Sequence, residues 1–256
     1  MVIANLDRPA SVLIAGASKG IGLAFSRLLA ANPAVSLLFL LSRHATRSEE
    51  LRLLQTSFPA KIFLIDCDTT DEADLNEAAA SVQRRTTLLH LMINTVGILH
   101  DDAMQPEKAL GQITLSNLQR AFATNACSGI LLAKAFLPWL KPAHPVVFAS
   151  LSARVGSIDD NRSGGWYSYR ASKAAHNQLM KTLSIELARL NANAIVLSLH
   201  PGTTETALSQ PFRLNVPPSR LFTPEFSAGA LMKIISQALP SDTGNFYAWD
   251  GEKIAW

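Results

Sequence analysis

The sequence has few cysteines and no group of side chains spaced to bind a metal. Only two cysteines, Cys67 and Cys127, occur among its 256 residues, and they lie far apart. Neither belongs to a Cys-x-x-Cys motif or a Cys/His group, and two cysteines are too few for a disulfide framework. The His, Asp and Glu residues show no ligand spacing either. We therefore expect two buried cysteines acting as small hydrophobic side chains, and no catalytic metal.

Long apolar runs and blocks of one charge are also missing. No apolar run approaches the roughly 20 residues that span a bilayer, and the N-terminus has no basic region before an apolar core. The net charge is only +3, and the lysines and arginines are scattered. This pattern supports neither nucleic acid nor a membrane surface as a partner. We expect a soluble, cytoplasmic protein.

The sequence does contain a regular alternation of short apolar runs and helical patterns. Such alternation is typical of a parallel sheet covered by helices on both faces. It predicts an α/β fold, a single doubly wound domain with a seven-stranded, mainly parallel sheet. The predicted strands are 11–16, 36–42, 61–67, 88–94, 145–151, 194–200 and 245–250, and the predicted helices are 20–31, 48–57, 71–84, 114–140, 167–190 and 225–238.

One long irregular stretch, 203–223, interrupts this alternation. It contains Pro211, Pro217 and Pro218. It follows a predicted central strand at its carboxyl end, where open α/β sheets bind ligands. A lid over a substrate is one interpretation, and an ordinary connecting loop is the other.

A glycine-rich turn joins the first predicted strand to the first predicted helix. It reads Gly16-Ala17-Ser18-Lys19-Gly20-Ile21-Gly22. Glycines permit a tight turn and close backbone approach, and the helix N-terminus presents amide donors to a pyrophosphate. With a strand before it and a helix after it, this turn predicts a dinucleotide site.

The residue after the second predicted strand indicates which dinucleotide binds. A protein that prefers NAD commonly places an acidic residue there to accept from the ribose 2′-hydroxyl. This sequence has Arg43 instead, together with Lys19 in the glycine turn. Both cations suit a 2′-phosphate, although both could also be ordinary surface residues. The expected cofactor is NADP(H).

Tyr169 and Lys173 are the candidate catalytic pair. They stand four positions apart in a predicted helix, and neither Tyr167 nor Tyr247 has a lysine at that spacing. Residues at i and i+4 lie on one helix face, so an ammonium beneath the phenol would favour its ionised form. Tyr169 is then a usable acid near neutral pH.

Together these motifs resemble the short-chain dehydrogenase/reductase family over essentially the whole chain. The segments 154–158, 164–173 and 248–251 look like the branch of C-factor-type proteins and sniffer-type carbonyl reductases. The resemblance implies one Rossmann domain, 1–256, with a cofactor half of about 1–145 and a substrate and catalytic half of about 146–256. It assigns cofactor binding to Gly16, Ser18, Lys19, Gly20, Ile21, Gly22, Arg43, Asp68, Asn94, Gly97, Tyr169, Lys173, Pro201, Gly202, Thr204 and Thr206, and catalysis to Asn125, Ser152, Tyr169 and Lys173.

Two positions depart from the family pattern. Thr95 stands where the family usually has asparagine, which questions one hydrogen bond that supports a strand. Where many members have adjacent serines, this chain has Ser150 and Ser152 separated by Leu151. We choose Ser152 as the catalytic serine because it is nearer the expected strand end, with Ser150 as a buried structural hydroxyl.

The resemblance implies reduction of an aldehyde, ketone or quinone by NADPH, or the reverse oxidation of an alcohol. Tyr169 gives its proton to the alkoxide, and Ser152 holds the carbonyl oxygen. Lys173 lowers the pKa of the phenol and contacts the nicotinamide ribose, while Asn125 holds a water that resupplies the proton. An apolar substrate pocket, or simply loop packing, is expected from Trp166, Thr203, Thr204, Leu208 and Phe212.

The resemblance also bears on two other functions and on the assembly of the chain. The resemblance to C-factor-type proteins permits an NADP-binding signalling or regulatory protein with weak or no catalysis. A sugar epimerase is disfavoured because the chain lacks room for a separate substrate domain. Family members commonly pair through the helices that correspond to 114–140 and 167–190, which implies a homodimer.

Overall fold

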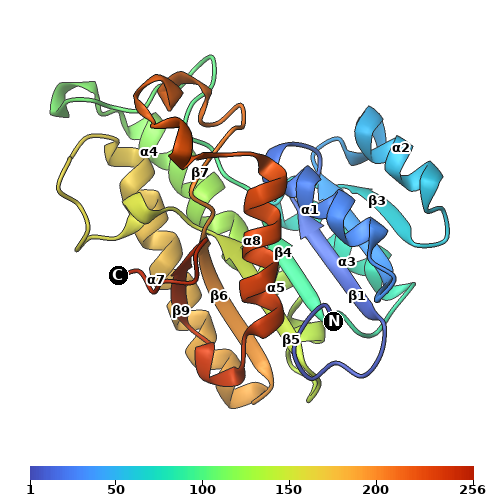
Figure 1. The fold of residues 1–256 in the computed structure, drawn as a ribbon. Coiled ribbons are helices and arrows are strands. Elements are labelled where there is room, and N and C mark those ends of the chain that lie inside the picture. Colours follow the sequence, from blue (N-terminus) through green and yellow to red (C-terminus); the bar gives the residue numbers. More distant parts are fainter.

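The apolar runs of the sequence form one parallel sheet in the computed structural model of the chain (Figure 1). The structure describes residues 1–212 and 216–256 with their side chains. All seven predicted strands are present, in the order β3-β2-β1-β4-β5-β6-β9, and each neighbouring pair is parallel. These strands are β1 (Ala10–Ala15), β2 (Val35–Ser42), β3 (Ile62–Asp66), β4 (Leu91–Asn94), β5 (Val146–Leu151), β6 (Ala194–His200) and β9 (Asn245–Ala248).

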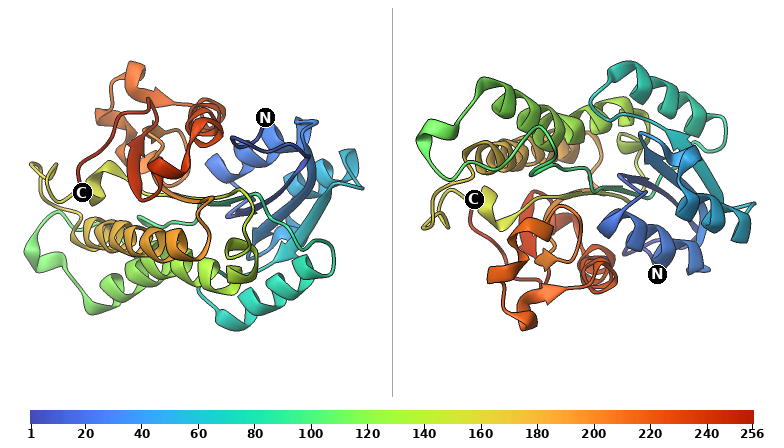
Figure 2. Two further views of the ribbon diagram at one scale, coloured as in Figure 1. Left: turned by 90° about the horizontal axis from the view of Figure 1, so that it is seen from below. Right: turned by 90° about the horizontal axis from the view of Figure 1, so that it is seen from above.

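Helices cover both faces of this sheet, as Figure 2 shows. One buried cluster joins the sheet to α1 and α8, and another joins its opposite face to α3, α5 and α7. The sheet is therefore doubly wound, as predicted. The helices are α1 (Gly20–Ala31), α2 (Glu49–Ser57), α3 (Glu72–Gln83), α4 (Leu115–Ala121), α5 (Ser128–Ala135), α6 (Leu137–Leu140), α7 (Tyr167–Leu190) and α8 (Pro224–Gln237).

The predicted helix 114–140 is divided rather than continuous. After α4 the chain makes a π-helical segment, η3 (Phe122–Cys127), and then continues as α5 and α6. A π turn adds a residue to the helical turn and often occurs at functional sites. It leaves Cys127 exposed while Cys67 is buried, so the expectation of two buried cysteines was wrong for Cys127.

The stretch 203–223, expected to be irregular, contains short ordered elements. A two-stranded parallel sheet joins its two ends, β7 (Thr203–Thr204) and β8 (Leu221–Phe222). The 3-10 helices η5 (Gln210–Asn215) and η6 (Pro218–Arg220) lie between those strands. The remaining 3-10 helices are η1 (Ala45–Arg47), η2 (Leu110–Gln112), η4 (Arg154–Gly156) and η7 (Pro240–Asp242).

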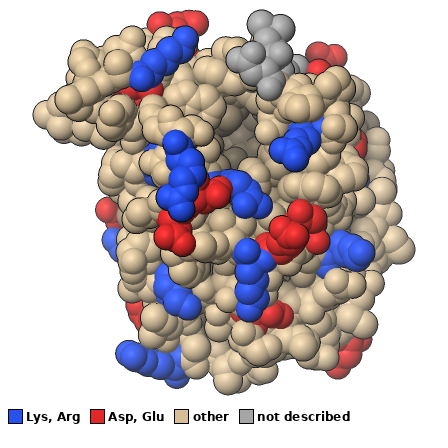
Figure 3. Space-filling model, turned by 60° about the vertical axis from the view of Figure 1, so that its left-hand side comes forward, with Lys and Arg blue, Asp and Glu red and all other residues tan. Residues whose placement is uncertain are grey.

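The surface carries mixed charge. On the face shown in Figure 3, Lys and Arg side chains are interspersed with Asp and Glu, and the surface is hollowed near its upper part. This face shows no extended basic patch. Over the part of the chain that was searched, no helix combines the length and apolar character needed to cross a bilayer.

A buried histidine makes the stability of this fold depend on pH. His90 is 3% exposed, and its Nδ1 accepts a hydrogen bond from the Ser11 backbone N–H at 3.0 Å. Burial, with smaller effects from His144 and Arg8, lowers the pKa of His90 from 6.5 to about 4. Between these values the unfolded chain binds more protons than the folded chain. The free energy of unfolding therefore falls as the pH falls.

We expect this loss to reach about 3 kcal/mol from His90 as the pH falls from 7 to 4, since one pKa unit corresponds to about 1.4 kcal/mol. Buried His176 and half-buried His200 act in the same direction, because loss of solvent around them lowers their pKa values to about 3 and about 4. Urea denaturation at pH 7 and at pH 4 measures the change. His90→Asn should weaken the dependence, because asparagine can accept from Ser11 without titrating. An equal free energy of unfolding at both pH values contradicts this expectation.

Candidate active site

The glycine-rich turn lies where β1 enters α1. Gly16 and Gly20 have φ of 81° and 50°, in the left-handed region that favours glycine. A Cβ on Gly22 would lie 2.1 Å from the Gly16 carbonyl oxygen, so only glycine fits there without rearrangement. No side chain caps the start of α1, and its first turn has no acidic residue. The amides of this turn therefore suit the phosphates of a dinucleotide.

Thr95 supports the turn in the place of the usual asparagine. Its Oγ1 donates to the carbonyl oxygens of Ala15, at 2.8 Å, and Gly16, at 3.2 Å. The side chain thus ties the end of β4 to the end of β1. Threonine thus makes a hydrogen bond that supports the strand end, although its side chain is shorter than that of asparagine.

Two cations stand beside the turn. Arg43 directly follows β2, and Lys19 precedes α1; both are exposed. Within the described part of the chain neither forms an ion pair or a side-chain hydrogen bond, so both can bind an anion. In the loop after β3, Asp68 Oδ1 accepts from the N–H and the hydroxyl of Thr70, at 2.9 and 2.7 Å. These bonds fix the direction of the Asp68 carboxylate.

Tyr169 and Lys173 occupy the first turns of α7, on one face of the helix. Lys173 is 3% exposed, and its Nζ donates to the Leu151 carbonyl oxygen at 3.0 Å. Burial lowers the pKa of Lys173 to about 8. Loss of solvent also raises the pKa of Tyr169, in the direction opposite to the lowering that the sequence argument expected from Lys173. The phenol therefore carries its proton at neutral pH in this structure.

Asn125 lies in the π-helical segment and is 1% exposed. Its Oδ1 accepts from the Ile98 N–H at 2.7 Å, and its Nδ2 donates to the Ile98 carbonyl at 2.8 Å and to Ser172 Oγ at 3.0 Å. A Cβ on Gly97 would lie 3.4 Å from Asn125 Oδ1 and 3.6 Å from Lys173 Nζ. The structure thus brings Gly97, Asn125 and Lys173 together.

Ser150 and Ser152 make different contacts. Ser150 is fully buried and accepts a hydrogen bond from Asn94 Nδ2 at 3.0 Å. Ser152 is also buried, and its Oγ donates to Asn177 Oδ1 at 2.6 Å. A hydroxyl has a single proton. In this geometry Ser152 can accept a hydrogen bond, and it must leave Asn177 before it can donate to a ligand.

Aromatic rings line the approach to Tyr169. The Trp166 ring lies edge-on to the rings of Tyr169 and Phe212, with centroid distances of 6.1 and 4.8 Å. His100 contacts the Phe212 ring at 5.9 Å, and its Nε2 lies 3.1 Å from the Ala207 carbonyl oxygen. The loop after β4 is therefore attached to the segment 203–223. Of the other predicted pocket residues, Leu208 also contacts His100 through its carbonyl oxygen, Thr203 is partly buried in β7, and buried Thr204 bonds Ser227.

The segment after β6 reaches back to the glycine-rich turn. A Cβ on Gly20 would lie 3.0 Å from Thr206 Cγ2, so Thr206 lies directly over the turn. Gly202, after Pro201, has φ of 76°, and a Cβ there would lie 2.6 Å from the Phe222 ring. Gly20 and Thr206, predicted cofactor residues from the two halves, are therefore neighbours beyond the carboxyl ends of the strands.

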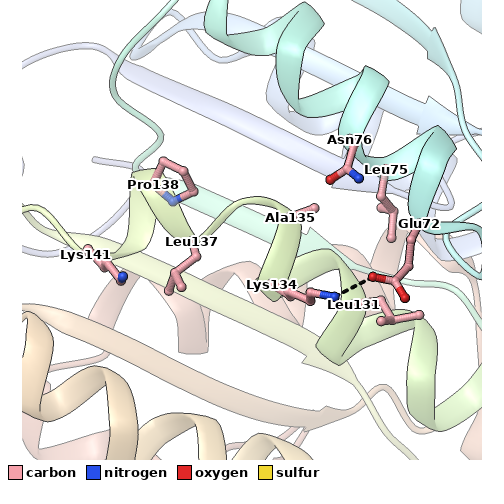
Figure 4. A pocket seen from close by; sticks show the side chains of 9 residues that line it. All are labelled: Glu72, Leu75, Asn76, Leu131, Lys134, Ala135, Leu137, Pro138 and Lys141. Carbon is pink, nitrogen blue, oxygen red and sulfur yellow. Dashed lines mark hydrogen bonds and ion pairs between the residues drawn. The ribbon is translucent and has the colours of Figure 1, made fainter.

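A separate cavity lies away from this site, and none of the predicted site residues lines it. It has a volume of about 300 Å³ and lies between α3 and the α5–α6 region (Figure 4). Lys134 Nζ and Glu72 Oε2 form an ion pair across it at 2.5 Å. In the searched part of the chain no three His, Cys, Asp or Glu side chains gather to hold a metal. The lining residues are Glu72, Leu75, Asn76, Leu131, Lys134, Ala135, Leu137, Pro138 and Lys141.

Two residues of the site were not found by sequence reasoning. Asn177 holds Ser152, and Glu107 contacts the start of α7 through Ser168. Asn177 follows Lys173 by one helical turn, so its spacing could have placed it on the active face. Glu107 belongs to no motif or periodic pattern, and only the tertiary structure shows its contact.

The chain was compared with known proteins at the level of family, sequence and fold. A family model described as short chain dehydrogenase matches residues 10–216. The NADPH-bound carbonyl reductase from chicken fatty liver is 30% identical, with a TM-score of 0.86, over 97% of this chain and 100% of that one. Carbonyl reductase Sniffer of D. melanogaster is 27% identical, with a TM-score of 0.85, over 96% and 99%. C-signal of Myxococcus xanthus is 29% identical over 58% of this chain and 84% of its own length.

Proposed function

The chain belongs to the short chain dehydrogenase family, and on that premise we propose that it reduces a carbonyl compound with NADPH, using Tyr169 as the acid. It is an NADP(H)-dependent oxidoreductase, and its similarity to two carbonyl reductases supports the substrate class. The observation that carries the mechanism is the position of the half-buried Tyr169 phenol one helical turn before buried Lys173 on α7. Reduction needs a proton donor at the alkoxide, and a phenol that keeps its proton at neutral pH meets this need.

The remaining residues bind and orient the reactants. The amides at the start of α1, together with Lys19 and Arg43, suit the phosphates of NADP(H). When bound, NADPH supplies the hydride that adds to the carbonyl carbon. Tyr169 donates its proton to the oxygen, and Lys173 stabilises the phenolate that remains, since an ammonium favours that charge. Asn125 holds the π-helical segment against α7 next to Lys173, where a water can resupply the proton.

Ser152 is proposed to hold the carbonyl oxygen after its hydroxyl turns away from Asn177. We expect Ser152→Ala to lower kcat/KM by about tenfold, the value of one neutral hydrogen bond of about 1.4 kcal/mol. Steady-state kinetics with NADPH in excess measures the change, and Ser150→Ala tests whether the neighbouring serine has that role instead. A larger loss in Ser150→Ala than in Ser152→Ala would reverse the assignment.

We also propose a cytoplasmic homodimer built from a single domain. The helices expected to pair carry exposed apolar side chains, Leu115 on α4 and Ile185 on α7, with exposures of 70% and 49%. Apolar side chains exposed on a monomer are covered when two copies associate. The cofactor half of about 1–145 and the catalytic half of about 146–256 share one continuous sheet, which supports one domain.

A signalling role is the second candidate, because the chain is also similar to C-signal of Myxococcus xanthus. That similarity covers 58% of the chain, whereas the similarity to the chicken carbonyl reductase covers 97%. Catalysis is therefore the better supported of the two functions.

The proposed function is tested by following NADPH absorbance when purified protein meets aromatic and aliphatic aldehydes, ketones and quinones. Oxidation of NADPH that depends on a carbonyl supports the proposal, and parallel assays with NADH measure the cofactor preference. Tight NADPH binding without turnover on any member of the panel would favour the signalling role.

A further inference from the structure

Glu107 is a buried carboxylate that the proposed mechanism does not use. It lies in the loop between β4 and α4 and is 3% exposed. Among the described residues, no Lys, Arg or His forms an ion pair with it. A buried charge without such a partner is costly unless other groups compensate it, so its contacts indicate why it is there.

Over the described part of the chain, the hydrogen bonds of Glu107 are all with the start of α7. The Glu107 Oε2 accepts from the Ser168 backbone N–H at 3.1 Å, and Oε1 accepts from the Ser168 hydroxyl. The Glu107 carbonyl oxygen accepts from the Trp166 N–H at 2.5 Å. The first amides of a helix have no partner within the helix, and a negative charge is favoured there by the helix dipole. Glu107 therefore caps α7 from a distant part of the chain.

This cap holds a backbone conformation that is otherwise unfavourable. Trp166 is the N-cap residue of α7 and has φ of 52° and ψ of 44°, with no side-chain cap of its own. Left-handed backbone is rare for a bulky residue and costs about 1–3 kcal/mol unless the surroundings fix it. The hydrogen bond from the Trp166 N–H to Glu107 is one of the contacts that fix it.

The strained residue is also the one that packs on the catalytic ring. Trp166 lies edge-on to Tyr169, three positions later in the same helix. Glu107, Ser168 and Tyr169 together line a cavity of only about 10 Å³, which has room for one water at most. A shift in the first turn of α7 would therefore move both the Trp166 ring and the Tyr169 hydroxyl.

The structure assigns to Glu107 the role of a positioning residue, which sets the Tyr169 hydroxyl by capping α7 and holding Trp166 in place. It acts through the helix and does not touch the reacting atoms. Its effect is expected mainly on the chemical step, because among the described residues Glu107 bonds Trp166 and Ser168 and makes no hydrogen bond with Arg43, Lys19 or the glycine-rich turn. This role rests on the proposed function, in which Tyr169 is the acid.

Glu107→Gln and Glu107→Ala test the assignment. Glutamine keeps one acceptor oxygen and loses the charge, whereas alanine removes both side-chain bonds to Ser168. The bond from the Trp166 N–H goes to the Glu107 main-chain carbonyl and stays in both variants. Displacing a reacting group by about 1 Å can cost about 100-fold in rate, so we expect kcat to fall by about 100-fold in Glu107→Ala and by about tenfold in Glu107→Gln. The Kd for NADPH, measured by fluorescence, should stay as in the wild type. Glu186→Gln, an exposed glutamate of the same helix, is the matched control and should keep full activity.

Activity is measured at a temperature where circular dichroism shows each variant to be folded. A wild-type kcat in both folded Glu107 variants overturns the assignment, as does a loss of kcat matched by an equal loss of NADPH affinity. If the Glu107 variants do not fold, Ser168→Ala decides: it removes one hydrogen bond of the cap and should lower kcat several-fold. A Ser168→Ala protein with unchanged kcat overturns the role. Tyr169→Phe is assayed alongside, because turnover that survives in it contradicts the proposed function itself.

Discussion

Tyr169→Phe should lower kcat by about 1,000-fold while NADPH still binds, because removing a general acid costs about 10²–10⁴ in rate. Phenylalanine keeps the ring that packs against Trp166, so the helix and its cap stay intact. The substitution therefore removes the proton and little else.

The chain offers a close control for this experiment. Tyr167 lies on the same helix two positions earlier and is 41% exposed. Tyr167→Phe removes the same hydroxyl from a position facing solvent and should leave kcat unchanged. Stopped-flow measurement of NADPH oxidation under single-turnover conditions separates the chemical step from product release. A Tyr169→Phe protein with near-normal single-turnover rate shows that another group supplies the proton.

Arg43→Ala should shift the cofactor preference from NADPH toward NADH by about 10- to 100-fold, the range for hydrogen bonds to a charged group of about 1.5–3 kcal/mol. The guanidinium can bind a 2′-phosphate with two hydrogen bonds, and alanine provides none. The ratio of kcat/KM for NADPH to kcat/KM for NADH measures the effect. Because Arg43 is exposed after the end of β2, the fold should tolerate the change.

Salt and a second arginine provide the controls for this result. Binding of NADPH should weaken more steeply than binding of NADH as ionic strength rises, because NADPH has one more exposed charge pair to be screened. Arg189→Ala, in the last turn of α7, removes the same charge far from the turn and should leave the ratio unchanged. If Arg43→Ala keeps the wild-type ratio of kcat/KM for NADPH to kcat/KM for NADH, then Lys19 alone binds the 2′-phosphate or the preference for NADPH has another source.

The sequence contains enough information to predict the sheet and to select candidate site residues, some of which the structure brings into contact. Each strand is a short apolar run between helical patterns, and this local signal does not depend on tertiary contacts. The pairing of Tyr169 with Lys173 follows from helix geometry alone. The position of the cofactor turn follows in the same way, from glycines between a strand and a helix.

The features that sequence reasoning missed depend on contacts between distant segments. The apolar pattern of 114–140 is similar for an α turn and a π turn, so the break at η3 has no periodic signal. Thr95 satisfies the Ala15 carbonyl only because β4 lies beside β1. Ser152 points at Asn177, and Glu107 at Ser168, because packing brings those residues together.

The order of strands in the sheet also has a consequence for synthesis on the ribosome. After β4 pairs with β1, each later strand of this sheet adds to its open edge. Strand β5 joins beside β4, β6 beside β5, and β9 beside β6. No later strand has to insert between two strands that are already paired, so the N-terminal part can fold while the rest is still being made, as domains generally do from the N-terminus. Tyr169, Lys173 and the segment after β6 emerge late. A truncated chain that ends before β6 could then hold much of the nucleotide-binding turn and yet have no complete site for the reaction.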